Sequence, residues 1–400
     1  MASGNPRKEP MNMDKPNRMR KASRSLLVSA LLVGFFLFCW KGCFDKKSIR
    51  VGFVAQLTDV QAELSVQERN GVQLAVEEIN TAGGIGGRLL ELVVQDDLGT
   101  PEGARAADRD LIDAGVVAII GHATSGQTLA GLAVTNPARV VMLSPTATIP
   151  QLSGRKDFFF RVIYSLKDRV HAFAQRIYQV RKITKLAAIC DTDNSAYSKA
   201  FLKAFREKYQ SLGGKITIEV DFSSKVQPDF SSSMENLRTG SPEGLLIVAA
   251  DIDTALIAQR TRLMGWPIAL FATAWAQTET LINNGGQAVE GLEIEIANTF
   301  NNPTPDYLDF KRRYQVRFGQ TPSFGAALGF EAAKLLTVAL KKTGGKAAGL
   351  AQTLTGIKKF KGLTDTISMD EYGDVVRPFS LCTTRDGKFV DTDVSITSAP

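Results

Sequence analysis

The stretch QERNGVQLAVEEINTAGGIGGRLLELVVQ, residues 67–95, contains the pattern that decides the fold. It opens with an amphipathic helix over 67–79, whose apolar positions share one face: Val72, Leu74, Ala75 and Ile79. The glycine-rich segment 82–87 ends this helix, because glycine readily adopts the positive φ angles of a tight turn. An apolar strand follows at 89–95, and another precedes the helix at 49–55. This order predicts a βαβ unit of a parallel sheet.

Short apolar strands and amphipathic helices alternate along most of the chain. A first series continues with strands at 116–120 and 140–143 and helices at 105–114 and 126–136. A second series, from about residue 168, has the same alternation: strands at 185–190, 215–220, 244–249 and 268–272, and helices at 195–212, 230–239 and 252–264. Two such series predict an α/β fold of two Rossmann-like lobes, each a mostly parallel sheet flanked by helices.

The end of the chain predicts two more helices, 308–318 and 326–341, and β-hairpin material at 367–390. No linker rich in proline, glycine or serine separates the two series, which favours three crossovers near residues 163, 300 and 363 over two domains in tandem. The predicted ranges follow from these crossovers: 49–163 and 300–362 for lobe 1, and 164–299 and 363–398 for lobe 2.

The positive charge of the chain is concentrated at its N-terminus. Residues 1–50 contain 11 Lys/Arg and 3 Asp/Glu, whereas the other 350 contain 37 and 38, so the body carries a net charge of −1. A near-neutral body argues against a nucleic-acid partner. The basic residues instead mark 1–24 as a leader that stays in the cytoplasm.

An uncharged apolar stretch, 26–40, follows the basic leader. As a helix it would span about 22 Å, short of the roughly 30 Å hydrocarbon core, which is typical of a signal sequence or a short anchor. Residues 25–43 therefore predict either an uncleaved signal anchor or a lipoprotein signal with lipidation on Cys43. Both alternatives place the body on the periplasmic or extracytoplasmic face, tethered to the membrane.

Catalytic and metal-binding signatures are missing from the sequence. It contains two histidines, no HExxH motif, no paired CxxC and no GxSxG elbow. Cys190 and Cys382 both lie in apolar strand-like runs and are predicted to be separate buried thiols. We therefore expect a binding protein with no enzymatic activity, no cofactor and no metal.

The loop 121–128 follows a strand and opens a helix, as a phosphate-binding loop would. Gln127 stands where such a loop needs lysine, so nucleotide hydrolysis is not expected. The Ser125 hydroxyl and the N–H groups of Gly126 and Gln127 can nevertheless hold an anion such as a carboxylate. The alternative is that Ser125 is a plain helix cap.

Polar groups also follow other strands, at the sheet edge where open α/β folds bind ligands. In the loop 144–150, Thr146, Ala147 and Thr148 offer hydroxyls and backbone groups between two prolines. Tyr197 is placed to close over a ligand, and Asp251 to pair with a ligand amine. Trp275 completes these candidates as an apolar wall. Turn formation, helix capping and core packing are the respective alternatives.

Together these segments resemble the branched-chain amino-acid-binding protein family, the type I periplasmic binding proteins of ABC importers. The resemblance covers about residues 48–398 and rests on several segments: 71–75, 79–87, 93–97, 119–122, 144–148 and 322–324, with Cys43-Phe44 and Lys46-Lys47 before the first strand. It implies the type I periplasmic binding protein fold. It also implies a ligand held between the lobes by hinge closure, and ABC permease and ATPase subunits as partners. A ligand-sensing module that signals through a separate membrane partner is the alternative.

The resemblance also assigns roles to residues. Ser125, Thr146 and Thr148 match the positions that hold a ligand's carboxylate and amine, and Tyr197 matches the residue that closes over it. The family's acidic residue for the ammonium group falls at about Ala274 and is absent. Asp251 is the expected substitute, which makes the ligand an amino acid or a similar small polar molecule.

Overall fold

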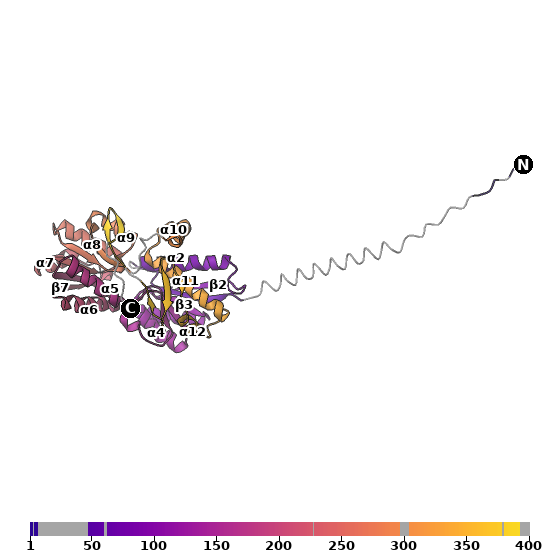
Figure 1. The fold of residues 1–400 in the computed structure, drawn as a ribbon, viewed down its shortest axis with the longest axis horizontal. Helices are drawn as coiled ribbons and strands as arrows, with labels where there is room; N and C mark the ends of the chain where they lie inside the picture. The colour runs from indigo at the N-terminus through magenta and orange to yellow at the C-terminus, as the bar shows by residue number, and fades with distance from the viewer. Residues whose placement is uncertain are drawn as a thin grey trace. The chain divides into compact units, whose positions relative to one another are not determined.

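The computed structural model describes residues 1–2, 4–6, 47–59, 62–226, 228–296, 304–377 and 380–392. The chain divides into two units, Met1–Lys47 and Ser48–Pro400, and the fold below is that of the second (Figure 1). The leader residues 7–24, the apolar stretch and Cys43 lie outside the described residues. Among the described helices, none is both long and apolar enough to cross a bilayer.

The first sheet contains five parallel strands in the order β2-β1-β3-β4-β5. Their bounds are β1 (Ile49–Ala55), β2 (Leu90–Asp96), β3 (Ala118–Gly121), β4 (Val141–Ser144) and β5 (Phe159–Arg161). The helices between them are α2 (Glu63–Thr81), α3 (Pro101–Asp113) and α4 (Ser125–Ala138). Strands β3 and β4 are buried at every residue, as expected for central parallel strands covered on both faces.

The second sheet contains seven strands in the order β15-β14-β10-β9-β8-β6-β7. Five are parallel: β6 (Lys185–Asp191), β7 (Lys215–Phe222), β8 (Gly244–Val248), β9 (Ala269–Ala272) and β10 (Glu293–Ile296). An antiparallel pair, β14 (Ser380–Arg385) and β15 (Lys388–Asp391), extends one edge. The helices of this half are α5 (Leu166–Gln175), α6 (Ser195–Ser211), α7 (Phe230–Thr239), α8 (Asp251–Leu263) and α9 (Glu279–Gly285).

Helices α10 (Pro305–Phe318) and α11 (Phe324–Thr343) pack against α2, beside the first sheet (Figure 1). Helices α2 and α11 approach closely because each has a glycine at the contact. A Cβ added at Gly71 would collide with the Ala326 backbone, and one at Gly329 with the Glu68 backbone. Residues more than 200 positions apart along the chain thus complete one half of the fold.

The last crossover differs from the predicted one. After α12 (Leu350–Thr355), the small sheet of β11 (Phe360–Lys361), β12 (Thr366–Met369) and β13 (Val375–Val376) forms. Ile367, Met369 and Val375 are buried in the core of the first half, and only β14 and β15 join the second sheet. The chain therefore returns to the second half after Arg377 and not near residue 363, because these apolar side chains pack on the first core.

The predicted α/β class with two mostly parallel, helix-flanked sheets is confirmed. Cys190 and Cys382 are buried free thiols, as predicted. The short strands β5 and β10 were not predicted from the sequence.

Candidate ligand-binding site

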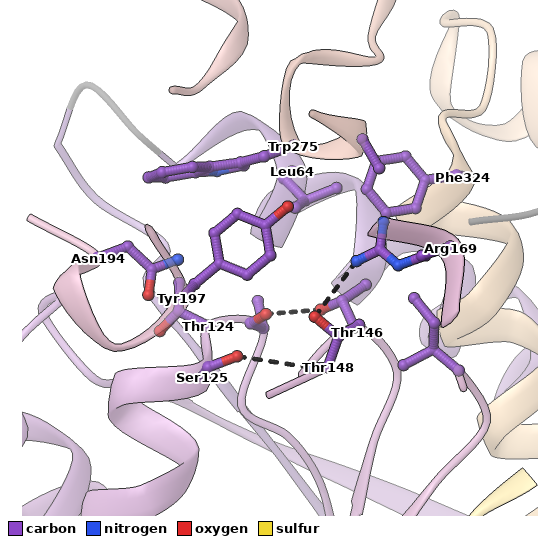
Figure 2. A pocket seen from close by; sticks show the side chains of 13 residues that line it. Leu64, Thr124, Ser125, Thr146, Thr148, Arg169, Asn194, Tyr197, Trp275 and Phe324 are labelled. Carbon is purple, nitrogen blue, oxygen red and sulfur yellow. Dashed lines mark hydrogen bonds between the residues drawn. The ribbon is translucent and has the colours of Figure 1, made fainter. Parts of the chain in front are cut away.

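A cavity lies among loops that follow the carboxyl ends of strands from both sheets (Figure 2). Its empty volume, including the mouth, is about 410 Å³. The first half contributes Leu64, Ala123, Thr124, Ser125, Thr146, Thr148, Ile163 and Phe324. The second half contributes Arg169, Asn194, Tyr197, Ala274 and Trp275.

The loops after β3 and β4 form the polar face of this cavity and bond to each other. Thr146 Oγ1 donates to the Ala123 carbonyl oxygen at 2.6 Å, and the Thr148 N–H donates to the Ser125 hydroxyl at 3.4 Å. Ser144 Oγ, at the end of β4, donates to the His122 carbonyl oxygen at 2.8 Å. The sequence-predicted Ser125, Thr146 and Thr148 are thus brought together on one wall.

Helix α4 begins at this wall. Its N-cap is Thr124, whose side chain makes no capping bond to the backbone, and Ser125 is the first helical residue. The alternative that Ser125 serves only as the cap is therefore wrong. Because the first N–H groups of a helix lack partners within the helix and carry partial positive charge, this end of α4 favours an anion.

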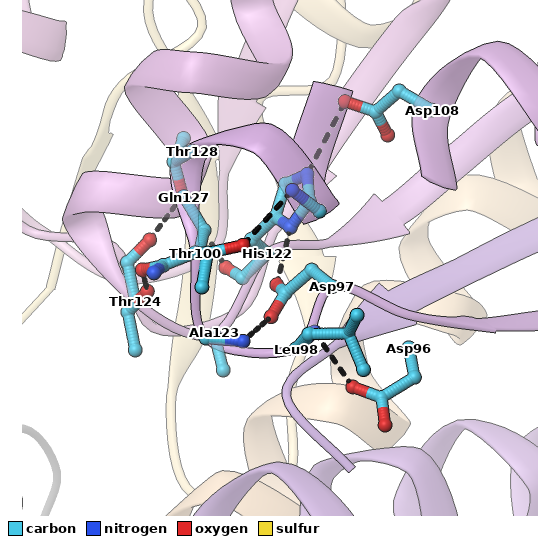
Figure 3. Close-up of polar contacts among 12 residues, drawn as sticks. Asp96, Asp97, Leu98, Thr100, Asp108, His122, Ala123, Thr124, Gln127 and Thr128 are labelled. Atoms are coloured by element: carbon cyan, nitrogen blue, oxygen red, sulfur yellow. Dashed lines mark hydrogen bonds and ion pairs between the residues drawn. The ribbon is translucent and has the colours of Figure 1, made fainter. Parts of the chain in front are cut away.

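A cluster of buried charged side chains anchors the β3–α4 loop to the rest of the first half (Figure 3). His122 Nδ1 lies 2.6 Å from Asp97 Oδ2, and His122 Nε2 lies 3.2 Å from Asp108 Oδ2; all three side chains are buried. Burial opposes the charged imidazolium, but the hydrogen bonds that its ring N–H groups donate to both carboxylates outweigh this effect and raise the pKa of His122 to about 9. The cation ties the loop to the segment after β2 and to α3.

Glu68 of α2 lies behind Thr146. Its Oε2 lies 3.1 Å from Thr146 Oγ1, whose proton goes to the Ala123 carbonyl oxygen, and Oε1 has no partner among the described residues. Burial raises the pKa of Glu68 to about 8, although the bond to Thr146 opposes the rise. The carboxyl group is therefore mainly protonated at neutral pH.

Two aromatic side chains form the opposite wall. The rings of Tyr197, in the first turn of α6, and Trp275, after β9, pack edge to face with centroids 5.9 Å apart at an angle of 84°. Both side chains are largely buried, and both line the cavity, as the sequence predicts.

Arg169 of α5 also lines the cavity, and sequence reasoning missed it. It is 1% exposed, pairs through Nη1 with Glu295 Oε2, and donates from Nη2 to Thr148 Oγ1 at 3.3 Å. Its Nε has no hydrogen-bond partner in the described part of the chain. A signal exists in the sequence: Arg169 lies three residues after Leu166 and four before Phe173, on the apolar face of its helix.

Three predicted residues lie outside this lining. Gly126 is the second residue of α4, and Ala147 lies in the loop after β4, where it is fully buried. Asp251 begins α8, accepts a hydrogen bond from the Thr278 hydroxyl, and lines a different cavity between α7 and α8. The structure therefore does not bring Asp251 to the position of the missing acid, because its carboxylate accepts a hydrogen bond from Thr278. No described residue of the lining carries a carboxylate.

The chain matches the periplasmic binding protein family over residues 48–388. A Leu/Ile/Val-binding protein homologue of Brucella melitensis is 25% identical over 347 residues, which are 86% of this chain and 93% of the relative. The structure of a leucine binding protein from Thermotoga maritima is 26% identical, covers 86% of this chain and 97% of its own, and superposes with a TM-score of 0.79. An ABC transporter solute binding protein from Rhodopseudomonas palustris, in complex with 3,4-dihydroxybenzoic acid, shares the fold at 22% identity, with a TM-score of 0.77 and coverage of 86% and 96%. This chain belongs to the periplasmic binding protein family, whose members bind solutes and are not enzymes.

Proposed function

We propose that the protein is an extracytoplasmic receptor of an ABC importer that captures an amino acid or a similar small polar ligand through its carboxylate. One observation carries the proposal: a single cavity has hydroxyls and a helix N-terminus on one wall and aromatic side chains on the other. The Thermotoga maritima leucine binding protein and the Brucella melitensis homologue support the ligand class.

The proposed mechanism is closure of the two halves around the ligand. The polar wall comes from the first half, whereas Arg169, Tyr197 and Trp275 come from the second. A ligand that contacts both walls stabilises the conformation in which they approach, and so shifts the population toward it. The closed receptor would deliver its ligand to the permease and ATPase subunits of the importer.

The N-terminal segment is proposed to tether the receptor. The charge asymmetry of residues 1–50 supports a cytoplasmic leader, and the uncharged stretch after it supports a signal anchor or a lipidated Cys43. Both forms keep the binding body at the extracytoplasmic face of the membrane, near its transporter.

A thermal-shift screen of the body, residues 48–400, with amino acids and small carboxylates tests this function. A ligand at 100 times its Kd adds about 2.7 kcal/mol to the free energy of unfolding. We expect stabilisation by at least one carboxylate, and at least a tenfold loss of its affinity in Ser125→Ala. Ser165→Ala is the matched control, because Ser165 also stands at a helix start but outside the cavity. If no carboxylate stabilises the protein, the proposal is wrong.

A further inference from the structure

We infer that the ligand is a small monocarboxylate with an apolar body and no ammonium group. This inference rests on the proposed function and narrows its ligand class. It depends on the only charged side chain among the described cavity-lining residues, Arg169, and on the lack of a carboxylate facing it.

Arg169 is a cation with unused hydrogen-bonding capacity. Its guanidinium has five N–H donors in a planar arrangement that matches a carboxylate. Glu295 and Thr148 occupy two of the nitrogens, and Nε has no partner among the described residues although it is buried. Figure 2 shows Arg169 next to Thr146 and Thr148, across the cavity from Asn194. A ligand carboxylate placed here meets the guanidinium and the neighbouring hydroxyls together.

Three carboxyl groups near the cavity offer no charge to a ligand: one is paired with Arg169, one is protonated, and one faces another cavity. Glu295 pairs with Arg169 and accepts a hydrogen bond from the Ala274 N–H at 3.2 Å. Glu68 lies behind Thr146, fully buried, and Asp251 lines another cavity. The internal segments outside the described residues contain no Asp or Glu: 60–61, 227, 297–303 and 378–379. An ammonium group in this cavity would therefore be desolvated beside a guanidinium, without a counter-charge.

The remaining lining determines the body of the ligand. Tyr197 and Trp275 present ring edges and faces, and apolar side chains from the first half complete the wall: Leu64, Ile163 and Phe324. Such a surface favours a branched aliphatic or aromatic group, because burying it against these side chains removes apolar area from water.

Matched ligands test the inference directly. For each apolar amino acid, the affinity of the full-length chain is measured by calorimetry for the amino acid, its des-amino acid and the amine that lacks the carboxyl group. Phenylalanine, 3-phenylpropanoate and 2-phenylethylamine form one such set, and leucine, 4-methylpentanoate and 3-methylbutylamine another. We expect at least one acid to bind tenfold or more tightly than its amino acid, and the amines not to bind.

Two results would overturn the inference in different ways. Amino acids that bind as tightly as their des-amino acids, or more tightly, would contradict the inference but leave the proposed function intact. Failure of both the amino acids and the acids to bind would contradict the proposed function as well.

A double variant tests the role of Arg169. Arg169→Met with Glu295→Gln removes the cation without leaving Glu295 buried and unpaired. The matched control is Arg176→Met with Glu293→Gln, which removes an ion pair of 2.7 Å from neighbouring elements outside the cavity lining. We expect the first variant to lose tenfold or more of its affinity for the acid and the control to retain it. Equal affinity of the two double variants for the acid would contradict the inference. If the first variant does not fold, the comparison of matched ligands still tests the inference.

Discussion

Glu68→Gln should change the way the stability of the protein depends on pH. In the folded protein the pKa of Glu68 is raised from 4.5 to about 8 by burial. The native state therefore keeps a proton that the unfolded chain releases between these values. This bound proton contributes its full stabilisation below pH 4.5, and the contribution is lost progressively as the pH rises from 4.5 through about 8.

The magnitude follows from the shift. Each pKa unit corresponds to about 1.36 kcal/mol, so the full effect is about 5 kcal/mol, of which about 4 kcal/mol falls between pH 5 and pH 8.5. Glutamine keeps an amide that can donate to the Thr146 hydroxyl oxygen, but it does not ionise. Relative to the native protein, Glu68→Gln should thus become more stable by about 4 kcal/mol as the pH rises from 5 to 8.5.

Urea unfolding at pH 5, 6.5 and 8.5, followed by tryptophan fluorescence, measures this difference. Glu77→Gln is the matched control on the same helix: Glu77 is exposed, and the hydrogen bond from Arg317 lowers its pKa. Its effect on stability should change little over this pH range. A Glu68→Gln effect that is constant within about 0.5 kcal/mol would show that Glu68 is not buried as a neutral acid, and would refute the reasoning.

Two further substitutions test the site and the packing. Asp251→Asn should leave the affinity for the carboxylate ligand within twofold of the native value by calorimetry, because Asp251 bonds to Thr278 and lies outside the cavity lining; a tenfold loss would return it to the binding site. Gly71→Ala should lower the free energy of unfolding by about 1–3 kcal/mol or more in urea titrations, because the new Cβ collides with the Ala326 backbone. Gly126→Ala, where the nearest contact to a Cβ is 3.8 Å, is its control and should be neutral or stabilising.

The fold class could be predicted because its signal is local. Strands and helices are set by the spacing of apolar residues within about ten positions, and the loops after parallel strands fall at one edge of a sheet. Ser125, Thr146 and Thr148 could be placed at one site for this reason, and so could Tyr197 and Trp275.

The chemistry of the cavity required the tertiary structure. Arg169 reaches the polar wall because α5 packs against β10. On β10, Glu295 accepts a hydrogen bond from one Arg169 nitrogen, although the two residues are 126 positions apart in the chain. Asp251 follows a strand end, as a binding residue would, yet its carboxylate bonds to Thr278. The sequence alone determined which loops surround the site. Contacts between segments far apart in the chain decided which charges face the ligand. The direction of a side chain depends on the elements packed around it, and the spacing of residues along the chain does not encode those contacts.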